Sequence, residues 1–259
     1  TFNGSLFLLP KDCRLTEFTL EGISNIQGDF QCIDYFYVKE FVMPFIRVAG
    51  DMTIALNSGS VNTAAEIEFP KLQEIGGTLT LGTNRNANNI TFPLLKKILG
   101  SCSVTTYNLK NDIEFTNLES IGTDGADAQI KFEIEATNIL CPKLKTINGK
   151  FDIATSSFMF DMEVDKVSYP NVESISENLS ITCPYSDFGS NGILSIDFSG
   201  LKSAKGISIS GQGDVTDFSS FKYLFENNVL TGESQWSVKE CGYNPTFQEM
   251  KDGKYKLAE

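Results

Sequence analysis

The chain has 259 residues, of which 41% are hydrophobic, so it is long enough to bury a substantial core. Its 33 acidic residues outnumber its 21 basic ones, and this excess of acid disfavours nucleic acid as a partner, because affinity for phosphates depends on Lys and Arg. The sequence contains no histidine, which disfavours Ser-His-Asp and Cys-His catalysis and removes the commonest zinc ligand. Any catalysis would have to use carboxylates, and we expect no metal and no cofactor.

The N-terminal segment, residues 1–19, is apolar and irregular, and we expect it to form a partial first rung or cap. The first residue is Thr1 and not Met, from which we expect an export signal or a lipid anchor upstream and an extracellular or cell-surface location. The chain has no apolar run long enough to span a membrane as a helix, so no membrane-spanning segment is predicted.

Residues 20–210 contain a repeat of 22 to 29 residues, a period typical of solenoids. Each of eight turns has an apolar anchor followed three positions later by a second apolar residue. The anchors are Ile23, Phe45, Leu72, Leu95, Leu118, Leu144, Val172 and Leu201. Six turns also carry a glycine five positions past the anchor, at Gly28, Gly50, Gly77, Gly100, Gly149 and Gly206. A glycine at this position predicts a corner with either positive φ or close backbone packing.

Alternating apolar residues predict strands on both sides of each anchor. The pairs after the anchor are Phe30/Cys32, Met52/Ile54, Leu79/Leu81, Cys102/Val104, Phe132/Ile134, Phe151/Ile153, Leu179/Ile181 and Ile207/Ile209. Phe132/Ile134 fits after a seven-residue insertion, and Ile207/Ile209 is one position early, which predicts a bulge or a shorter corner. The pairs before the anchor are Ile67/Phe69, Ile90/Phe92, Ile113/Phe115, Ile139/Cys141, Val167/Tyr169 and Ile196/Phe198. Each turn therefore adds at least two strands to different sheets, which predicts a mainly β chain folded as a β-solenoid.

The C-terminal segment, residues 211–259, is expected to cap the solenoid. Phe218, Phe221, Leu224 and Phe225 lie at helical spacing and predict an amphipathic helix within 217–228. Thr246 and Glu249 have the spacing of a capping box and predict a second short helix. Since no linker divides the array, we expect one domain over residues 1–259, present as a monomer.

Six cysteines fall into two groups. Cys32, Cys102 and Cys141 occupy positions that other turns fill with Ile, Leu or Phe, which predicts small core hydrophobes. Cys13, Cys183 and Cys241 lie outside the repeat columns, and a disulfide among them is compatible with an oxidising compartment.

The unit I-x-F-P-x-L-x-x-I-x-G-x-L-x-I resembles the repeat of receptor L domains and related irregular leucine-rich-repeat proteins. Residues 242–256, "GYNPTFQEMKDGKYK", also resemble the ends of leucine-rich-repeat surface lipoproteins of Gram-negative commensal bacteria. These resemblances imply a right-handed solenoid outside the cytoplasm that acts by binding and not by catalysis.

Small polar residues alternate with the buried ones on the strand that follows each corner. We predict a binding row for a protein or glycan ligand at Gln31, Thr53, Thr80, Ser103, Asp152 and Ser180. The longer connections at 55–66, 83–89, 155–166 and 183–192 are the alternative recognition site. A third interpretation is that short polar side chains only solvate the sheet.

Two further function classes stay open. The acidic run Asp161, Glu163 and Asp165 is compatible with a carboxylate-based glycosidase or lyase, since paired acids hydrolyse sugars without histidine. A purely structural surface domain is the other alternative. The row of threonines is too interrupted for an ice-binding lattice. We therefore expect an extracellular binding or adhesion module and no enzyme.

Overall fold

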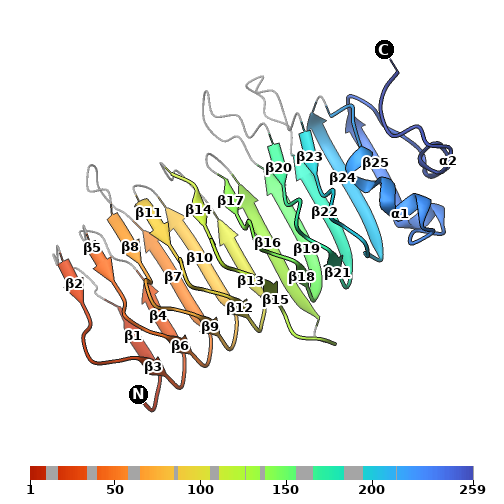
Figure 1. Cartoon of the computed structure of the whole chain (residues 1–259). Helices are drawn as coiled ribbons and strands as arrows, with labels where there is room; N and C mark the ends of the chain where they lie inside the picture. Colours follow the sequence, from red (N-terminus) through yellow and green to blue (C-terminus); the bar gives the residue numbers. More distant parts are fainter. Residues whose placement is uncertain are drawn as a thin grey trace.

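The computed structural model of the chain describes residues 1–9, 17–33, 40–57, 65–84, 87–105, 111–125, 127–134, 138–155, 166–183, 195–213 and 215–258. Within these ranges the chain is mainly β and winds as a β-solenoid with parallel sheets (Figure 1). The two termini lie at opposite ends of the array. In a solenoid of this kind each rung contacts mainly the rungs before and after it.

The broad sheet is the largest wall of the solenoid and has ten strands among the described residues. In spatial order they are β1 (Leu6–Leu8), β4 (Phe30–Ile33), β7 (Met52–Asn57), β10 (Leu79–Asn84), β13 (Cys102–Thr105), β16 (Ala128–Ile134), β19 (Gly149–Thr155), β22 (Asn178–Cys183), β24 (Gly206–Gly213) and β25 (Trp236–Cys241). Every neighbouring pair is parallel, as the repeat predicts.

Two narrower walls complete each rung. The corner sheet contains β3 (Asn25–Ile26), β6 (Arg47–Val48), β9 (Glu74–Ile75), β12 (Lys97–Ile98), β15 (Ser120–Ile121), β18 (Thr146–Ile147) and β21 (Ser174–Ile175). The split sheet contains β2 (Glu17–Thr19), β5 (Glu40–Val42), β8 (Ala65–Glu68), β11 (Ala87–Thr91), β14 (Ile113–Glu114) and β17 (Ile139–Leu140), then a break, then β20 (Lys166–Ser168) and β23 (Ser195–Asp197).

The core consists of ladders of like residues, one column for each apolar position of the repeat. The anchors from Phe45 to Leu201 are fully buried, and Ile23 is partly buried against the same cluster. Phe69, Phe92 and Phe115 stack with ring centroids 5.1 Å apart, close to the spacing of neighbouring strands. In-register stacking therefore turns each apolar position of the repeat into a continuous strip of buried surface.

The corner glycines are required by close backbone packing and not by positive φ. A Cβ on Gly77 would lie 2.2 Å from Asp51 Oδ1 and 2.8 Å from the carbonyl carbon of Gly50. A Cβ on Gly100 would lie 2.7 Å from the carbonyl carbon of Gly77, so successive glycines stack on one another. The glycines with positive φ lie elsewhere, at Gly22, Gly122, Gly125, Gly211 and Gly253. Of the two explanations for the repeated glycine, packing is the correct one.

The predicted register of one strand is wrong. Cys102 pairs with Ile130 and Val104 with Phe132, so the insertion after Leu118 has five residues and not seven, and the pair Phe132/Ile134 is displaced by two positions. Ile130, Phe132 and Ile134 are all buried, and a shift by two residues keeps the same face inward, so alternation alone does not detect it. At Ile207/Ile209, by contrast, strands β22 and β24 pair without interruption, which makes the corner before β24 one residue shorter.

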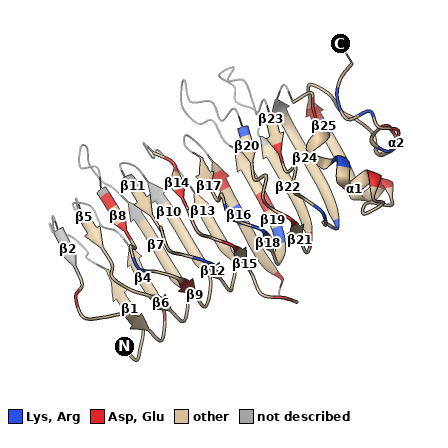
Figure 2. Ribbon diagram, in the orientation of Figure 1, with Lys and Arg blue, Asp and Glu red and all other residues tan. Residues whose placement is uncertain are grey.

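An alternating row of charges follows the corner sheet. Backbone hydrogen bonds of 2.8–3.0 Å stack Lys96, Glu119, Lys145, Glu173 and Lys202 in successive rungs. Figure 2 shows positive and negative segments next to one another along this edge. Lys202 donates to Glu173 at 2.8 Å, and this hydrogen bond holds the pKa of Glu173 below its usual value. Opposite charges on neighbouring strands support the correct pairing, although each exposed pair contributes little to stability.

The C-terminal cap contains both predicted helices and one strand that the sequence interpretation missed. The first helical segment is a 3₁₀ turn, η1 (Ser219–Phe221), followed by α1 (Lys222–Glu226), and all four of its predicted apolar residues are buried. A second 3₁₀ turn, η2 (Glu233–Gln235), precedes β25. The last helix, α2 (Phe247–Lys251), has Thr246 as its N-cap, and the Thr246 side chain forms the predicted capping box with Glu249. The solenoid thus ends with a helical layer over β25.

Candidate functional site

The predicted binding residues lie in one continuous row across the broad sheet. Gln31, Thr53, Thr80 and Ser103 are direct partners in successive strands. The row continues through Lys131 to Asp152 and Ser180, and then to Ser208 and Ser237. We call this set, from Gln31 to Ser237, the polar row. Its members follow one another at about 4.8 Å, the usual distance between strands.

Lys131, Ser208 and Ser237 belong to the polar row but were absent from the predicted site, and Ser237 lies in β25, the strand that the sequence interpretation missed. The sequence interpretation named no outward residue for the turn that contains β16, whose register it displaced by two residues, so Lys131 was not included. Ser208 was omitted because its turn was assigned to the beginning of the cap. Aligning residues 128–134 on all three buried positions at once would have identified Lys131.

A short charged band divides the polar row into two neutral segments. Lys131 forms an ion pair with Glu133 at 2.5 Å, and Lys150 forms one with Asp152 at 2.9 Å. Hydrogen bonds from Lys131 and Thr105 hold the pKa of Glu133 below its usual value despite partial burial. Before the band the row has hydroxyl and amide groups, and after it only serines, so only the centre of the row is charged.

The acidic side chains in the column next to the polar row accept hydrogen bonds from backbone N–H groups. Asp29 Oδ1 accepts the N–H of Asp51 at 2.9 Å, and Asp51 Oδ1 accepts the N–H of Thr78 at 2.7 Å. Ser5 and Ser101 do the same for Asp29 and Gln129. These side chains close the corners between rungs, which explains acidic residues here without a catalytic role.

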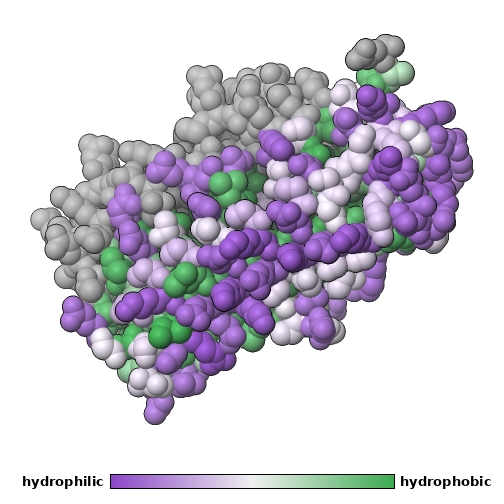
Figure 3. All heavy atoms as spheres, viewed as in Figure 1, coloured by the Kyte–Doolittle hydropathy of each residue, from purple (hydrophilic) through white to green (hydrophobic). Residues whose placement is uncertain are grey.

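The surface around the polar row has low relief. Ala55, Gly82 and Ala154 lie two residues further along strands of the row and add almost no side chain. Figure 3 shows the opposite side of the molecule, with the split sheet in front as in Figure 1, and there too hydrophilic residues form a band along its length. A wall with regularly spaced hydrogen-bonding groups can contact an extended or flat ligand.

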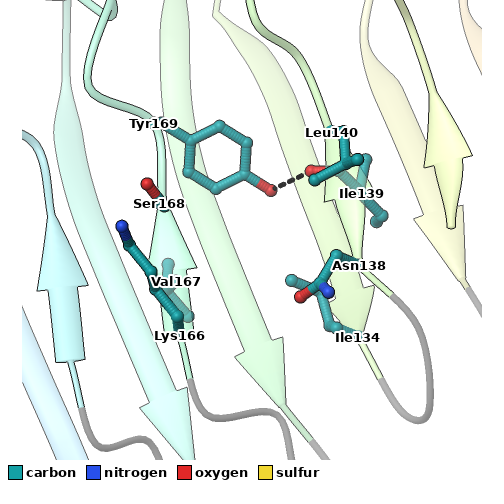
Figure 4. A pocket seen from close by; sticks show the side chains of 8 residues that line it. All are labelled: Ile134, Asn138, Ile139, Leu140, Lys166, Val167, Ser168 and Tyr169. Atoms are coloured by element: carbon teal, nitrogen blue, oxygen red, sulfur yellow. Dashed lines mark hydrogen bonds between the residues drawn. The ribbon is translucent and has the colours of Figure 1, made fainter.

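The break in the split sheet is the second notable feature. Elsewhere in this sheet consecutive rungs pair, but β17 and β20 do not, although β16 pairs with β19 and β18 pairs with β21 around them. The Tyr169 hydroxyl donates instead to the carbonyl of Ile139 at 3.0 Å (Figure 4). Burial raises the pKa of Tyr169 well above its usual value, so the hydroxyl remains a donor at neutral pH.

A pocket of about 140 Å³ occupies this break, and we call it the gap pocket. It is lined by Ile134 and by residues 138–140 and 166–169. Figure 4 shows Lys166, Val167 and Ser168 on one side, Asn138, Ile139 and Leu140 on the other, and Tyr169 across one end. Apolar side chains form most of its walls, with Asn138, Lys166 and Ser168 as the polar groups.

The cysteine prediction is confirmed for three residues. Cys32, Cys102 and Cys141 are buried in the core with free thiols, and burial raises the pKa of each thiol well above its usual value. Their thiols therefore stay protonated and pack as small apolar groups. Cys13 and the side chain of Cys183 lie outside the described residues, so the disulfide among Cys13, Cys183 and Cys241 stays a prediction.

The other candidate sites lie mostly at residues that the structure does not describe. The acidic run Asp161, Glu163 and Asp165 and most of the four long connections are not among the described residues. Within the described ranges, no cluster of three or more Cys, Asp or Glu residues is arranged to hold a metal ion. No helix in those ranges has the length and apolarity needed to cross a membrane. Comparison with protein-family models, with curated proteins and with solved structures finds no match.

Proposed function

We propose that this chain is a non-catalytic extracellular binding or adhesion module that recognises a protein or glycan through the polar row. The observation that carries the proposal is the alignment of the separately predicted residues Gln31, Thr53, Thr80, Ser103, Asp152 and Ser180 in a single line on the broad sheet. Hydroxyl, amide and carboxylate groups repeat there at strand spacing, on a wall whose corners and core are already satisfied.

The chemistry of the row favours hydrogen bonding over ionic recognition. Its two end segments are neutral, and the charges of the central band are largely paired with one another. A hydroxyl-rich ligand such as a glycan, or a peptide laid across the strands, has the matching donors and acceptors. The proposal assigns no general acid, base or nucleophile to the row.

The finer class follows from the repeat. We propose a right-handed solenoid of eight turns, similar to receptor L domains and irregular leucine-rich-repeat proteins, exposed at a cell surface and held there by an upstream lipid anchor. The support is the unit quoted above, in which seven of the eight anchors are fully buried, and the resemblance of residues 242–256 to surface lipoproteins. An experimental structure would test the handedness and the number of turns.

The test is a screen of the purified chain against arrays of glycans and extracellular-matrix proteins. A variant carrying Thr80→Arg and Ser103→Arg places two bulky charges in the polar row, and Ser203→Arg places one at an exposed position outside the broad sheet as a control. We expect a ligand that the control retains and the row variant loses. A ligand retained by both would move the site to the long connections, and silence across both arrays would favour a structural role.

A further inference from the structure

The gap pocket is produced by two specific residues and not by a general irregularity of the repeat. The column that holds Phe69, Phe92 and Phe115 contains Cys141 in the next rung and Tyr169 in the one after. Cys141 is small, and the Tyr169 hydroxyl reaches across to the carbonyl of Ile139. In the regular pattern of this sheet that carbonyl would accept the N–H of Ser168, so the tyrosine replaces the contact that would close the sheet.

The pattern of paired rungs shows which backbone groups face the gap. In the rung before the break, Ile113 and Phe115 donate their N–H groups to the next rung, to Asn138 and Leu140. By the same alternation the N–H of Ile139 points toward β20, and the N–H and C=O of Ser168 and the C=O of Lys166 point toward β17. None of these four groups has a backbone partner within the described ranges.

Several hydrogen-bond donors lie around the gap pocket beside the two backbone carbonyl groups. The N–H groups of Ile139 and Ser168 are joined by three side-chain donors, the Ser168 hydroxyl, the Asn138 amide and the Lys166 ammonium group. Two of these also contact a carboxylate of the chain, since the Ser168 hydroxyl donates to Asp197 at 3.5 Å and the Asn138 amide donates to Asp112 at 3.4 Å. Among the described residues, Lys166 forms a long ion pair with Asp197 at 3.7 Å, and more than half of the lysine side chain is exposed, so the ammonium group can also reach a ligand. The remaining walls, from Ile134, Ile139 and Val167, are apolar.

The same corner contains another unsatisfied polar group. The side chain of Thr155 is only 4% exposed, and its hydroxyl has no hydrogen-bond partner among the described residues. Thr155 pairs in register with Ile134, which lines the gap pocket. Polar groups without a partner among the described residues therefore lie on both sides of Ile134.

We propose that the gap pocket binds a carboxylate carried on a short branched aliphatic stem. The stem would lie against Ile134, Ile139 and Val167, and the carboxylate would accept from the Lys166 ammonium group and from Ser168. The volume of about 140 Å³ limits the stem to a few carbons, since a cavity of about 150 Å³ holds one benzene molecule. Such a group occurs both in free short-chain acids and at the C-terminus of a peptide that ends in valine.

The test follows the backbone amide signals of Ile139 and Ser168 in the isotope-labelled chain during titration. The probes are isobutyrate and its neutral isostere isobutyramide, followed by N-acetylvaline and N-acetylvalinamide. We expect saturable shifts with the carboxylates and none with the amides. Binding of both carboxylates would identify a general acid site, whereas binding of N-acetylvaline alone would identify a peptide end as the source.

Three variants locate the site. Lys166→Met removes the ammonium group and keeps most of the stem, so binding should weaken by about tenfold or more. Lys202→Met removes another exposed, ion-paired lysine and should leave binding unchanged. Tyr169→Phe restores the phenylalanine of the column and frees the Ile139 carbonyl for Ser168, so it should abolish binding and slow the exchange of the Ser168 amide.

The proposal is overturned if no carboxylate gives a saturable shift, if isobutyramide binds as well as isobutyrate, or if Lys202→Met weakens binding as much as Lys166→Met. A water-filled break in the sheet would then be the better description. The gap pocket lies on the split sheet and the polar row on the broad sheet, so either proposal can fail without the other.

Discussion

The broad sheet and the split sheet are built from the same repeat, yet only one of them is continuous. Strands β13, β16, β19 and β22 pair without a break, whereas the split sheet is interrupted between β17 and β20. The interruption coincides with the one place in the aromatic column where a small residue, Cys141, is followed by a larger one with a hydroxyl, Tyr169. One column of the core therefore controls whether the backbone outside it can pair.

Because of this difference, the two sheets suit the two different kinds of ligand proposed above. The broad sheet pairs in continuous register from β4 to β22 and carries mostly short polar groups in its outward row, which favours a shallow and regular surface. The split sheet leaves donors and acceptors unpaired around the gap pocket, which makes it the place where a small ligand can complete the structure. A continuous sheet favours a large and shallow contact with a ligand, and a break in a sheet favours a small and local one.

The largest expected effect comes from emptying the aromatic column. Phe92 is fully buried between Phe69 and Phe115, so Phe92→Ala should lower the free energy of unfolding by about 4 kcal/mol. Phe115 stacks on Phe92 but has Cys141 on its other side, so Phe115→Ala should cost about 1 kcal/mol less. Urea denaturation of both variants checks the order, and equal losses would show that Cys141 does not weaken the column.

The next effect tests the packing of the corners of the broad sheet. Gly77→Ala puts a methyl group 2.2 Å from Asp51 Oδ1 and 2.8 Å from backbone, so it should lower the free energy of unfolding by about 3 kcal/mol. Gly82, in strand β10 of the same rung, is a control, because a Cβ there meets nothing within 4 Å, and Gly82→Ala should change stability by less than about 0.5 kcal/mol. A similar midpoint in urea for both variants would contradict the packing explanation.

The sequence predicted the continuous wall far better than the break. Period-two alternation identified the buried residues of β4, β7, β10, β19 and β22, because each strand exposes one face and buries the other. It could not fix the register of β16, where a shift of two residues leaves the same face buried. The column containing Cys141 and Tyr169 was recognised, but its consequence was not, since that depends on where a hydroxyl reaches in three dimensions.

The gap pocket was therefore absent from the sequence interpretation. A hydroxyl in a phenylalanine column is the only signal the sequence offers for it. The polar row, in contrast, was predicted apart from Lys131, Ser208 and Ser237, because outward positions follow directly from inward ones once the strands are known. Periodic features can be predicted from a repeat, and a departure from the period needs the packed structure.

A smaller effect concerns the unsatisfied hydroxyl beside the break. Replacing Thr155 by Val keeps the shape and removes a buried oxygen without a partner, so the free energy of unfolding should rise by about 1 kcal/mol. Thr53→Val, on the outer face of the broad sheet, should change it by less than about 0.5 kcal/mol. If Thr155→Val destabilises the chain in the urea midpoint, the hydroxyl has a partner after all, and the corner is not an unsatisfied one.

The smallest effect concerns the cap, where the broad sheet ends. Hydrogen bonds from Thr246 hold the pKa of Glu249 below its usual value, and the Trp236 indole donates to Pro245, next to this capping box, at 2.9 Å. A folded-state pKa below the unfolded one means that the carboxylate contributes fully above about pH 4.5 and loses its contribution as the pH falls through the lowered value.

Fluorescence of Trp236, the only tryptophan, should therefore change at acidic pH before the solenoid unfolds. Glu249→Gln should remove this acid transition while leaving the unfolding transition of the sheets in place, since Glu249 touches the capping box and no strand. A transition that persists in Glu249→Gln would assign it to another carboxylate. If the sheets unfold together with the cap, the stability of the broad sheet depends on the cap. Loss of the cap would then destabilise every strand of this sheet, because the strands are paired without a break.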